Sequence, residues 1–296
     1  FDRIDQSLNY FYFLFTQPLE ELEGKNLFVP TLEYYEPISY WIKEFCSEWG
    51  NFLSEEESWN DDYFDTFINS EHFYNEKNWY PTENIYHSYN DFFARHLISA
   101  DVRPIGDAEV VSPTDSVPKG IFHIEEDGLL KDGVQIKSNR FFYVDDLLGP
   151  ESEFRGKFNG GTLTYTFLDV NDYHRYHFPV SGKILEMKRI AGICSCGGTI
   201  TFDCTSGRYV LKSKDITWQT LETRNLVIVE TDYGLVACLP VGMSQVASCN
   251  FEDCLHVGDT VKRGDPLGYF LLGGSEFVMI FDKNIEVTLV CEVDRH

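Results

Sequence analysis

The sequence predicts an α+β protein in which a helical N-terminal region precedes a mainly antiparallel β core with barrel-sandwich-like hairpins. Two observations predict the order of the elements, and the hydrophobic content shows that the chain can bury a core. Apolar residues recur with helical spacing before residue 100, short β-rich runs follow Arg103-Pro104, and 43% of the 296 residues are hydrophobic. We therefore expect an aromatic-rich, acidic helical region over residues 1–104 and a β-rich core over residues 105–296.

The clearest helix signal lies between Pro37 and Gly50, where apolar side chains recur on one helical face. Pro37 suits the first turn, because its missing N–H would have no partner there. A second helix start is predicted at Ser88, since Asp91 follows three residues later in a capping-box pattern. The apolar positions of the first helix are Ile38, Trp41, Ile42, Phe45, Trp49 and Phe52.

The second half is expected to be mainly β. Leu226–Glu230 and Leu235–Leu239 flank an Asp-Tyr-Gly turn, which predicts a hairpin whose Gly234 takes a positive φ. The Gly-rich stretch His256–Gly268 has the turn pattern of lipoyl-type barrel-sandwich hairpins but lacks their exposed carrier lysine. Further strands are expected at Lys183–Ile190, Thr199–Asp203 and Arg208–Lys212.

Charge and hydropathy exclude several classes of protein. The chain has 24 basic and 48 acidic residues, a net charge of −24, which argues against nucleic-acid partners held by clustered Lys and Arg. No apolar run approaches the roughly 20 residues of a membrane-spanning helix. Because no export signal is visible and cysteine use is ordinary, we expect a cytoplasmic protein. Peripheral membrane contact through the aromatic segment Tyr10–Phe15 and assembly into a homo-oligomer are left open.

Several clusters carry candidate chemistry, and each is ambiguous alone. His174 and His177, three residues apart, are either a metal-ligand pair or two histidines satisfied by backbone hydrogen bonds. Gly273-Gly274-Ser275 before an apolar strand is most often a tight turn. Cys194-Ser195-Cys196 invites a zinc interpretation, but without a second close pair the signal is weak, so we expect no metal site. The acidic run Glu55–Glu57 is expected to be a solvated loop.

Taken together, the ordered motifs along the chain become specific. They are Tyr89–Arg95, Arg103-Pro104, Ser112–Asp115, Tyr173–Pro179, Gly242-Met243 and Lys262–Phe270 running into Gly273-Gly274-Ser275. In this order, over about residues 85–282, they resemble the phosphatidylserine decarboxylase family of pyruvoyl-dependent enzymes. The acidic, aromatic N-terminal half and the Gly273–Phe277 segment look more like the related soluble tryptophan decarboxylases.

The resemblance implies a proenzyme that cuts itself between Gly274 and Ser275. The Ser275 hydroxyl would attack the carbonyl of Gly274, and because a hydroxyl is a poor nucleophile, a general base is required. His177, oriented by Asp115, would supply that base, as in a Ser-His-Asp triad. Elimination and hydrolysis would convert Ser275 to the pyruvoyl cofactor. The cleaved C-terminal fragment would remain a partner of the larger piece.

The resemblance also implies the second reaction. The pyruvoyl ketone would form a Schiff base with a substrate amine and withdraw electrons as the α-carboxylate leaves as CO₂. His174 is the candidate for polarising the site and returning a proton to the carbanion. We favour a free aromatic amino acid such as tryptophan, because an enzyme acting on an anionic lipid usually has a basic surface. The alternative is a phosphatidylserine decarboxylase that makes phosphatidylethanolamine.

The sequence departs from the family pattern at two positions. Glu276 stands where Thr is usual, and its carboxylate is expected to add negative charge near the attacking oxygen. Ser116 stands where Gly is common, which is a smaller change. The first departure motivates a hypothesis of another class, an inactive homologue that serves as a binding module.

Overall fold

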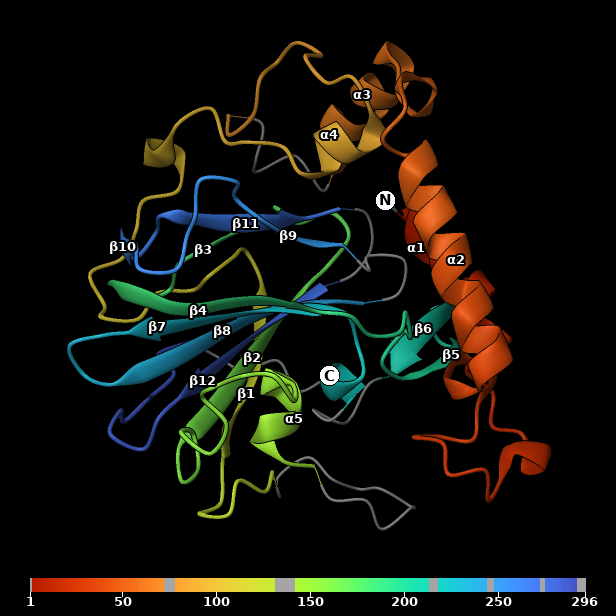
Figure 1. Cartoon of the computed structure of the whole chain (residues 1–296). Helices are drawn as coiled ribbons and strands as arrows, with labels where there is room; N and C mark the ends of the chain where they lie inside the picture. Colours follow the sequence, from red (N-terminus) through yellow and green to blue (C-terminus); the bar gives the residue numbers. More distant parts are fainter. Residues whose placement is uncertain are drawn as a thin grey trace.

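The computed structural model describes residues 2–71, 78–130, 142–212, 218–243, 248–271 and 275–291. In this part of the chain, four α-helices come first and lie along one side and the top of the β core in Figure 1. The α+β class with mainly antiparallel strands is confirmed, since every strand pairing among these residues is antiparallel. The helices are α1 (Asp2–Phe13), α2 (Glu36–Phe52), α3 (Asp61–Ile68), α4 (Tyr89–Phe93) and α5 (Val144–Leu148). Short 3₁₀ helices occur at Glu20–Leu22, Leu32–Tyr34, Glu56–Ser58, Ala100–Val102 and Trp218–Thr220.

Both helix starts predicted from the sequence are confirmed. In α2, Pro37 lies in the first turn and Ile42 is buried on the inner face. At the start of α4, the Ser88 hydroxyl accepts a hydrogen bond from the backbone N–H of Asp91 at 3.1 Å. The Asp91 carboxylate in turn accepts from the backbone N–H of His87 at 3.0 Å. The Ser88 cap thus satisfies one N–H group that the helix leaves without a partner, and Asp91 fixes the residue before the cap.

Two other N-terminal segments, Glu55–Glu57 and Tyr10–Phe15, differ in how far their side chains are exposed. Glu55–Glu57 is exposed, as expected, although part of it forms a 3₁₀ turn instead of a loop. The aromatic segment near Tyr10 is divided between surface and core: Tyr10 and Leu14 are 60% and 68% exposed, whereas Tyr12 is 1% exposed. Within the described part of the chain, no helix is both long and apolar enough to span a bilayer.

A seven-stranded sheet forms the core, with the order β1-β2-β12-β8-β7-β4-β10. The predicted hairpin is its β7-β8 pair, with Gly234 at φ 145° in the turn. The last strand, β12, lies inside the sheet between β2 and β8, so it is bonded on both sides. The strands are β1 (Val117–His123), β2 (Thr162–Leu168), β4 (Gly182–Ile190), β7 (Arg224–Glu230), β8 (Leu235–Gly242), β10 (Thr260–Val261) and β12 (Ser275–Phe281).

Two smaller sheets accompany the large one. The two strands predicted at Thr199–Asp203 and Arg208–Lys212 are present as β5 and β6, and they pair with each other in an antiparallel hairpin. In the second, β11 (Pro266–Phe270) lies between β3 (Arg175–His177) and β9 (Cys249–Phe251). The Gly-rich stretch before Gly268 therefore links two sheets, because β10 pairs with β4 while β11 pairs with β3 and β9.

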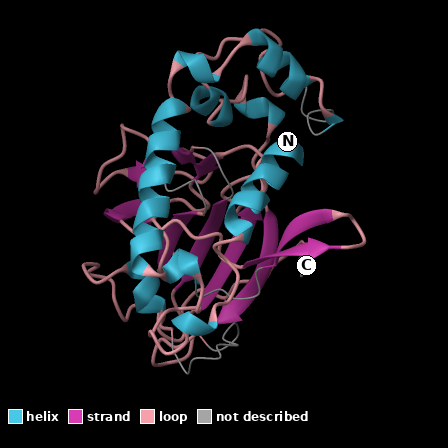
Figure 2. Cartoon of the chain, turned by 90° about the vertical axis from the view of Figure 1, so that its right-hand side faces the viewer, coloured by secondary structure: helices cyan, strands magenta, loops and turns pink. Residues whose placement is uncertain are grey.

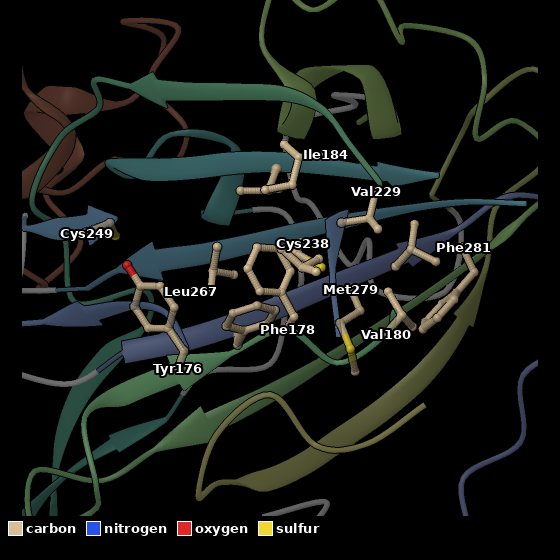
Figure 3. Close-up of a cluster of buried hydrophobic side chains, with 14 of the residues drawn as sticks. Tyr176, Phe178, Val180, Ile184, Val229, Cys238, Cys249, Leu267, Met279 and Phe281 are labelled. Atoms are coloured by element: carbon tan, nitrogen blue, oxygen red, sulfur yellow. The ribbon is translucent and has the colours of Figure 1, made fainter. Parts of the chain in front are cut away.

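Two apolar cores lie on the two faces of the large sheet. One core joins α5 to the sheet face that carries Val278 and Ile280. The other joins β3 and β11 to the opposite face, where Phe277 and Met279 lie; Figure 3 shows part of it. The side chains of β12 therefore alternate between the cores, as expected for a strand buried on both faces.

The helices pack against the β core through two further clusters. Tyr12, Ile42 and Cys46 of α1 and α2 contact residues 194–200, and Figure 2 shows these helices crossing in front of the strands. Aromatic side chains of α3 and α4 contact Tyr173, which lies just before β3 in the chain. The helical region thus supports the segment that carries both candidate histidines.

Candidate active site

Ser275 is the first residue of the central strand β12 and pairs with Leu168 and Gly242 on the two neighbouring strands. Its side chain is fully buried, and its hydroxyl has no hydrogen-bond partner among the described residues. Gly274, the other half of the predicted cleavage site, lies outside the described residues. A buried, unpaired hydroxyl is an uncommon feature that calls for an explanation, and a chemical role is one of the usual ones.

Glu276 points away from Ser275, which corrects the expectation that its carboxylate lies beside the attacking oxygen. Successive side chains of a strand alternate between faces, and those of Ser275 and Phe277 share the face opposite to that of Glu276. The Glu276 carboxyl accepts a hydrogen bond of 2.6 Å from the Gln219 amide. Burial raises the pKa of Glu276 to about 8, so the group is mostly neutral at pH 7. The adverse charge expected from this residue is therefore largely absent.

His177 ends β3 with both ring nitrogens engaged. Nδ1 lies 3.0 Å from the carbonyl oxygen of Gly264, and because a carbonyl can only accept, Nδ1 carries the proton. Burial lowers the pKa of His177 below its ordinary value, so the ring is neutral at pH 7 and Nε2 holds a lone pair. That lone pair accepts a hydrogen bond from the hydroxyl of Tyr173 at 3.3 Å. This is the tautomer that a general base acting through Nε2 requires.

Asp115 has a different partner from the one expected. Its carboxylate is bound to the guanidinium of Arg103, with Nε at 3.1 Å, and no hydrogen bond joins it to His177 in the described structure. The prediction that Asp115 orients the His177 ring is thus corrected, because the Gly264 carbonyl occupies Nδ1. The two segments still touch, since the backbone N–H of His177 donates to the carbonyl of Pro113 at 2.7 Å.

His174 is fully buried immediately before β3. Its Nδ1 donates to the carbonyl of Asp172 at 2.9 Å, and the same oxygen accepts from the guanidinium of Arg95 at 3.1 Å. The ring stacks on Phe93 of α4 with centroids 3.9 Å apart, and it also meets the edge of Phe270. The tight stacking and shared carbonyl hold this imidazole in one orientation.

Backbone pairing with β11 places the two histidines at different distances along the chain from Ser275. Phe270, at the end of β11, donates to the His174 carbonyl, whereas His177 pairs with Pro266 at the start of β11. β3 pairs with β11, and only residues 271–274 separate the end of β11 from Ser275. Tyr176 of β3 also contacts Phe277 of β12, with ring centroids 5.8 Å apart. No hydrogen bond links Ser275 to either histidine in the described structure, so a change in side-chain position must precede proton transfer.

The histidine pair and the cysteines show no arrangement typical of a metal site. The Nδ1 atoms of His174 and His177 each bond to a backbone carbonyl, which favours hydrogen-bonded histidines over a metal-ligand pair. Cys194 and Cys196 lie in the buried contact between helices and strands, and all eight cysteines are free thiols. Among the described residues, no group of three His, Cys, Asp or Glu side chains is placed to hold a metal ion.

Sequence reasoning gave no role to three residues at this site: Tyr173, Gly264 and Gln219. Tyr173 and Gly264 lie inside motifs that the sequence analysis singled out, so the sequence could have pointed to them. Their hydrogen bonds to His177 could not be predicted from the sequence. No feature of the sequence pointed to Gln219, because its contact with Glu276 spans 57 positions in the chain.

The ordered motifs and their placement can be compared with known proteins. The sequence model of the phosphatidylserine decarboxylase family matches residues 89–294. The chain belongs to this family. The match includes every candidate site residue, from Asp115 to Ser275. It also includes each strand of the described β core, from β1 to β12.

Three curated relatives have different names. A phosphatidylserine decarboxylase proenzyme of Fusobacterium nucleatum is 32% identical over 208 residues, covering 69% of this chain and 62% of that protein. An L-tryptophan decarboxylase of Psilocybe cyanescens is 27% identical over 292 residues, covering 86% of this chain and 64% of that protein. A decarboxylase of Amanita muscaria, iboD, is 29% identical over 213 residues, covering 68% and 60%. This chain therefore spans somewhat less than two thirds of these three relatives.

Proposed function

We propose that this chain is a proenzyme that cuts between Gly274 and Ser275 and becomes a pyruvoyl-dependent decarboxylase. The observation that carries the proposal is the Ser275 hydroxyl, buried without a partner among the described residues at the start of the central strand. The neutral His177 ring with its lone pair on Nε2 supports the same assignment. Membership of the phosphatidylserine decarboxylase family supports it independently.

The proposed self-cleavage uses the chain's own groups. His177 Nε2 takes the proton of Ser275 as the serine oxygen attacks the Gly274 carbonyl carbon, and the proton passes to the departing amide nitrogen. The peptide bond is thereby exchanged for an ester. Loss of the Ser275 Cα proton and breakage of its Cβ–Oγ bond leave a carboxylate on Gly274 and dehydroalanine at position 275. Tautomerisation and addition of water then release ammonia and leave a pyruvoyl group.

Asp115 has a proposed electrostatic role. Its carboxylate neutralises Arg103, a cation held next to the segment that binds the His177 backbone. An unpaired guanidinium there would disfavour a positive charge on His177 when the ring takes up the serine proton.

The buried Ser275 position suits a pyruvoyl group, because the group is made from the serine itself. When formed, this group supplies an electrophilic ketone that binds a substrate amine and draws electrons from the bond to the α-carboxylate. We assign to His174 the return of a proton to the substrate carbon after CO₂ has left. Its fixed orientation, between Asp172 and Phe93, supports that role.

For the substrate, we propose a free aromatic amino acid such as tryptophan. The Psilocybe cyanescens tryptophan decarboxylase aligns with 86% of this chain, so that similarity reaches into the N-terminal region as well. The net charge of −24 also opposes contact with an anionic lipid surface. Phosphatidylserine is the second candidate, favoured by the 32% identity to the Fusobacterium nucleatum proenzyme. The eight free thiols suit the reducing cytoplasm in which we place the protein.

Denaturing electrophoresis of the purified chain tests self-cleavage. We expect the wild-type protein to yield a large fragment and a small C-terminal fragment with a blocked N-terminus, whereas Ser275→Ala stays in one piece. Ser206→Ala, at an exposed turn, is the control and should be cleaved like the wild type. Cleavage of the Ser275→Ala variant would refute the assigned nucleophile. A wild-type chain that stays intact after long incubation would favour the inactive binding module.

Release of CO₂ from labelled substrates tests the second reaction. Matured protein is incubated with carboxyl-labelled tryptophan, other amino acids, or phosphatidylserine in liposomes. We expect release from the aromatic amino acid. Release from the liposomes alone would overturn the substrate proposal and establish the second candidate.

A further inference from the structure

Tyr173 is placed to control the base that the proposed self-cleavage needs. Its hydroxyl lies 3.3 Å from His177 Nε2, the atom that must accept the serine proton. The two rings are nearly parallel, with an interplanar angle of 18° and centroids 5.9 Å apart. Since Nδ1 of His177 is held by the Gly264 carbonyl, the Tyr173 hydroxyl occupies the one remaining polar position of the ring.

The Tyr173 ring is itself held firmly. It is 6% exposed and belongs to the aromatic cluster that includes Trp59, Phe92 and Phe93 from the helical region. Its backbone carbonyl lies 3.4 Å from the Thr114 hydroxyl, next to Asp115. Burial raises the pKa of Tyr173 to about 12, so the hydroxyl remains a donor throughout the neutral range.

We propose that Tyr173 is a positioning residue that holds the Nε2 lone pair of His177 in a resting hydrogen bond and thereby restrains self-cleavage until the base turns to Ser275. This inference rests on the proposed function, since it assigns His177 as the base. The helical region takes part because its aromatic cluster sets the position of the hydroxyl. The same hydrogen bond lowers the pKa of His177, because a donor to Nε2 stabilises the neutral ring and opposes its protonation.

Other charged groups also act on His177 and must stay constant in a test. Arg175 on the same strand opposes protonation of the ring, whereas Glu252 and Asp265 favour it. Arg175 and Glu252 form an ion pair at 2.8 Å. Replacing Tyr173 by Phe leaves all three in place and keeps the aromatic ring in its cluster, so the hydroxyl alone is removed.

The first measurement is made without any cleavage. In the intact Ser275→Ala protein, the pKa of His177 is followed by NMR titration with and without Tyr173→Phe, and the resonance is assigned by its loss in His177→Asn. We expect Tyr173→Phe to raise the pKa by about half a unit to one unit, the size of one lost hydrogen bond. An unchanged or lowered pKa would overturn the proposal. This result is obtained even if the wild-type chain never cuts itself, so it separates this proposal from the proposed function.

The second measurement follows the rate of self-cleavage against pH with Ser275 present. We expect Tyr173→Phe to cut roughly two- to tenfold faster at high pH, with the rising limb of the profile displaced to higher pH. Tyr86→Phe is the matched control, because its buried hydroxyl lies in the same cluster and has no hydrogen-bond partner among the described residues. It should match the wild type. A Tyr173→Phe rate that is equal to or slower than that of the wild type contradicts the restraint.

Discussion

The roles proposed for the two histidines of the candidate site can be separated by experiment. His177 has its lone pair on Nε2 and is neutral, whereas His174 is fixed between a carbonyl and a phenyl ring. We predict that His177→Asn slows self-cleavage by about 10²- to 10⁴-fold, the range of a lost general base. His174→Asn should still be cut but release CO₂ much more slowly. Electrophoresis and CO₂ release on the same samples measure the two effects, and an intact His174→Asn chain would contradict this division of roles.

Glu276 should give the protein a measurable dependence of stability on pH. Its pKa is about 8 in the folded chain and near 4.5 when unfolded, so between these values the folded state binds more protons. Stability contributed by this group is therefore present below pH 4.5 and is lost as the pH rises toward 8, with a slope of up to about 1.4 kcal/mol per pH unit. We predict that Glu276→Gln flattens this part of the profile.

Urea unfolding of the intact Ser275→Ala protein at pH 5.5, 7 and 8.5 measures the effect of Glu276→Gln. Burial also raises the pKa of Glu33 to about 8, so the parent's stability profile contains a contribution from Glu33. The contribution of Glu276 is therefore the difference in unfolding free energy between the variant and the parent at each pH. Exposed Glu48→Gln is the control and should leave the profile unchanged. Parallel profiles for the parent and Glu276→Gln would show that this carboxyl does not hold a proton near neutral pH.

For single residues, the sequence pointed to candidates for the site but did not predict their contacts. Ser275 and His177 were recognised from short motifs. The direction of Glu276 followed only from the register of a buried strand, where a shift by one residue would reverse every side chain. The partner of Asp115 could not be predicted either, because a carboxylate is bound by whichever cation the fold brings near, here Arg103.

Among the elements, β12 is the one that would hold the two pieces together after the proposed self-cleavage. Its seven residues pair with β2 on one side and β8 on the other, and all seven side chains are buried. Burial of one large apolar side chain stabilises by about 1.5–3 kcal/mol, and β12 buries Phe277, Val278, Met279, Ile280 and Phe281. We therefore predict that the fragment 275–296 stays bound after the peptide bond is cut.

Size-exclusion chromatography of the cleaved protein checks this retention. The small fragment should elute with the large one in native buffer and separate from it in concentrated urea. The Ser275→Ala chain, run alongside, gives the elution volume of the uncut fold. Elution of the small fragment alone in native buffer would mean that β12 is held less tightly than its pairing indicates.

The elements best predicted from the sequence are those with local signals. Helix α2 has regularly spaced apolar residues and a proline in its first turn, and the β7-β8 hairpin has a glycine in its turn. The place of β12 between β2 and β8 has no local signal, since its partners lie far away in the chain. The link that residues 256–268 make between two sheets could not be predicted either, because it also depends on partner strands far away in the chain.

At the scale of the whole molecule, charge bears on the choice between substrates. The chain carries −24 in total, and residues 1–100 hold 19 acidic and 5 basic residues. Anionic membranes attract clusters of Lys and Arg by about 1 kcal/mol per residue and repel acidic surfaces. Two exposed side chains offer apolar contact with lipid: Leu14, which directly follows α1, and Trp41 on α2. Both helices also carry acidic residues.

We therefore predict that the protein stays in the supernatant when sedimented with phosphatidylserine vesicles at low ionic strength, where repulsion is screened least. Neutral phosphatidylcholine vesicles are the control for purely apolar attachment. The double variant Leu14→Ser, Trp41→Ser tests whether these two exposed side chains cause any attachment that is seen. Sedimentation with the phosphatidylserine vesicles that is lost in this double variant would show that apolar contact outweighs the charge. In that case the net charge would no longer count against a lipid substrate, and phosphatidylserine would become the first candidate.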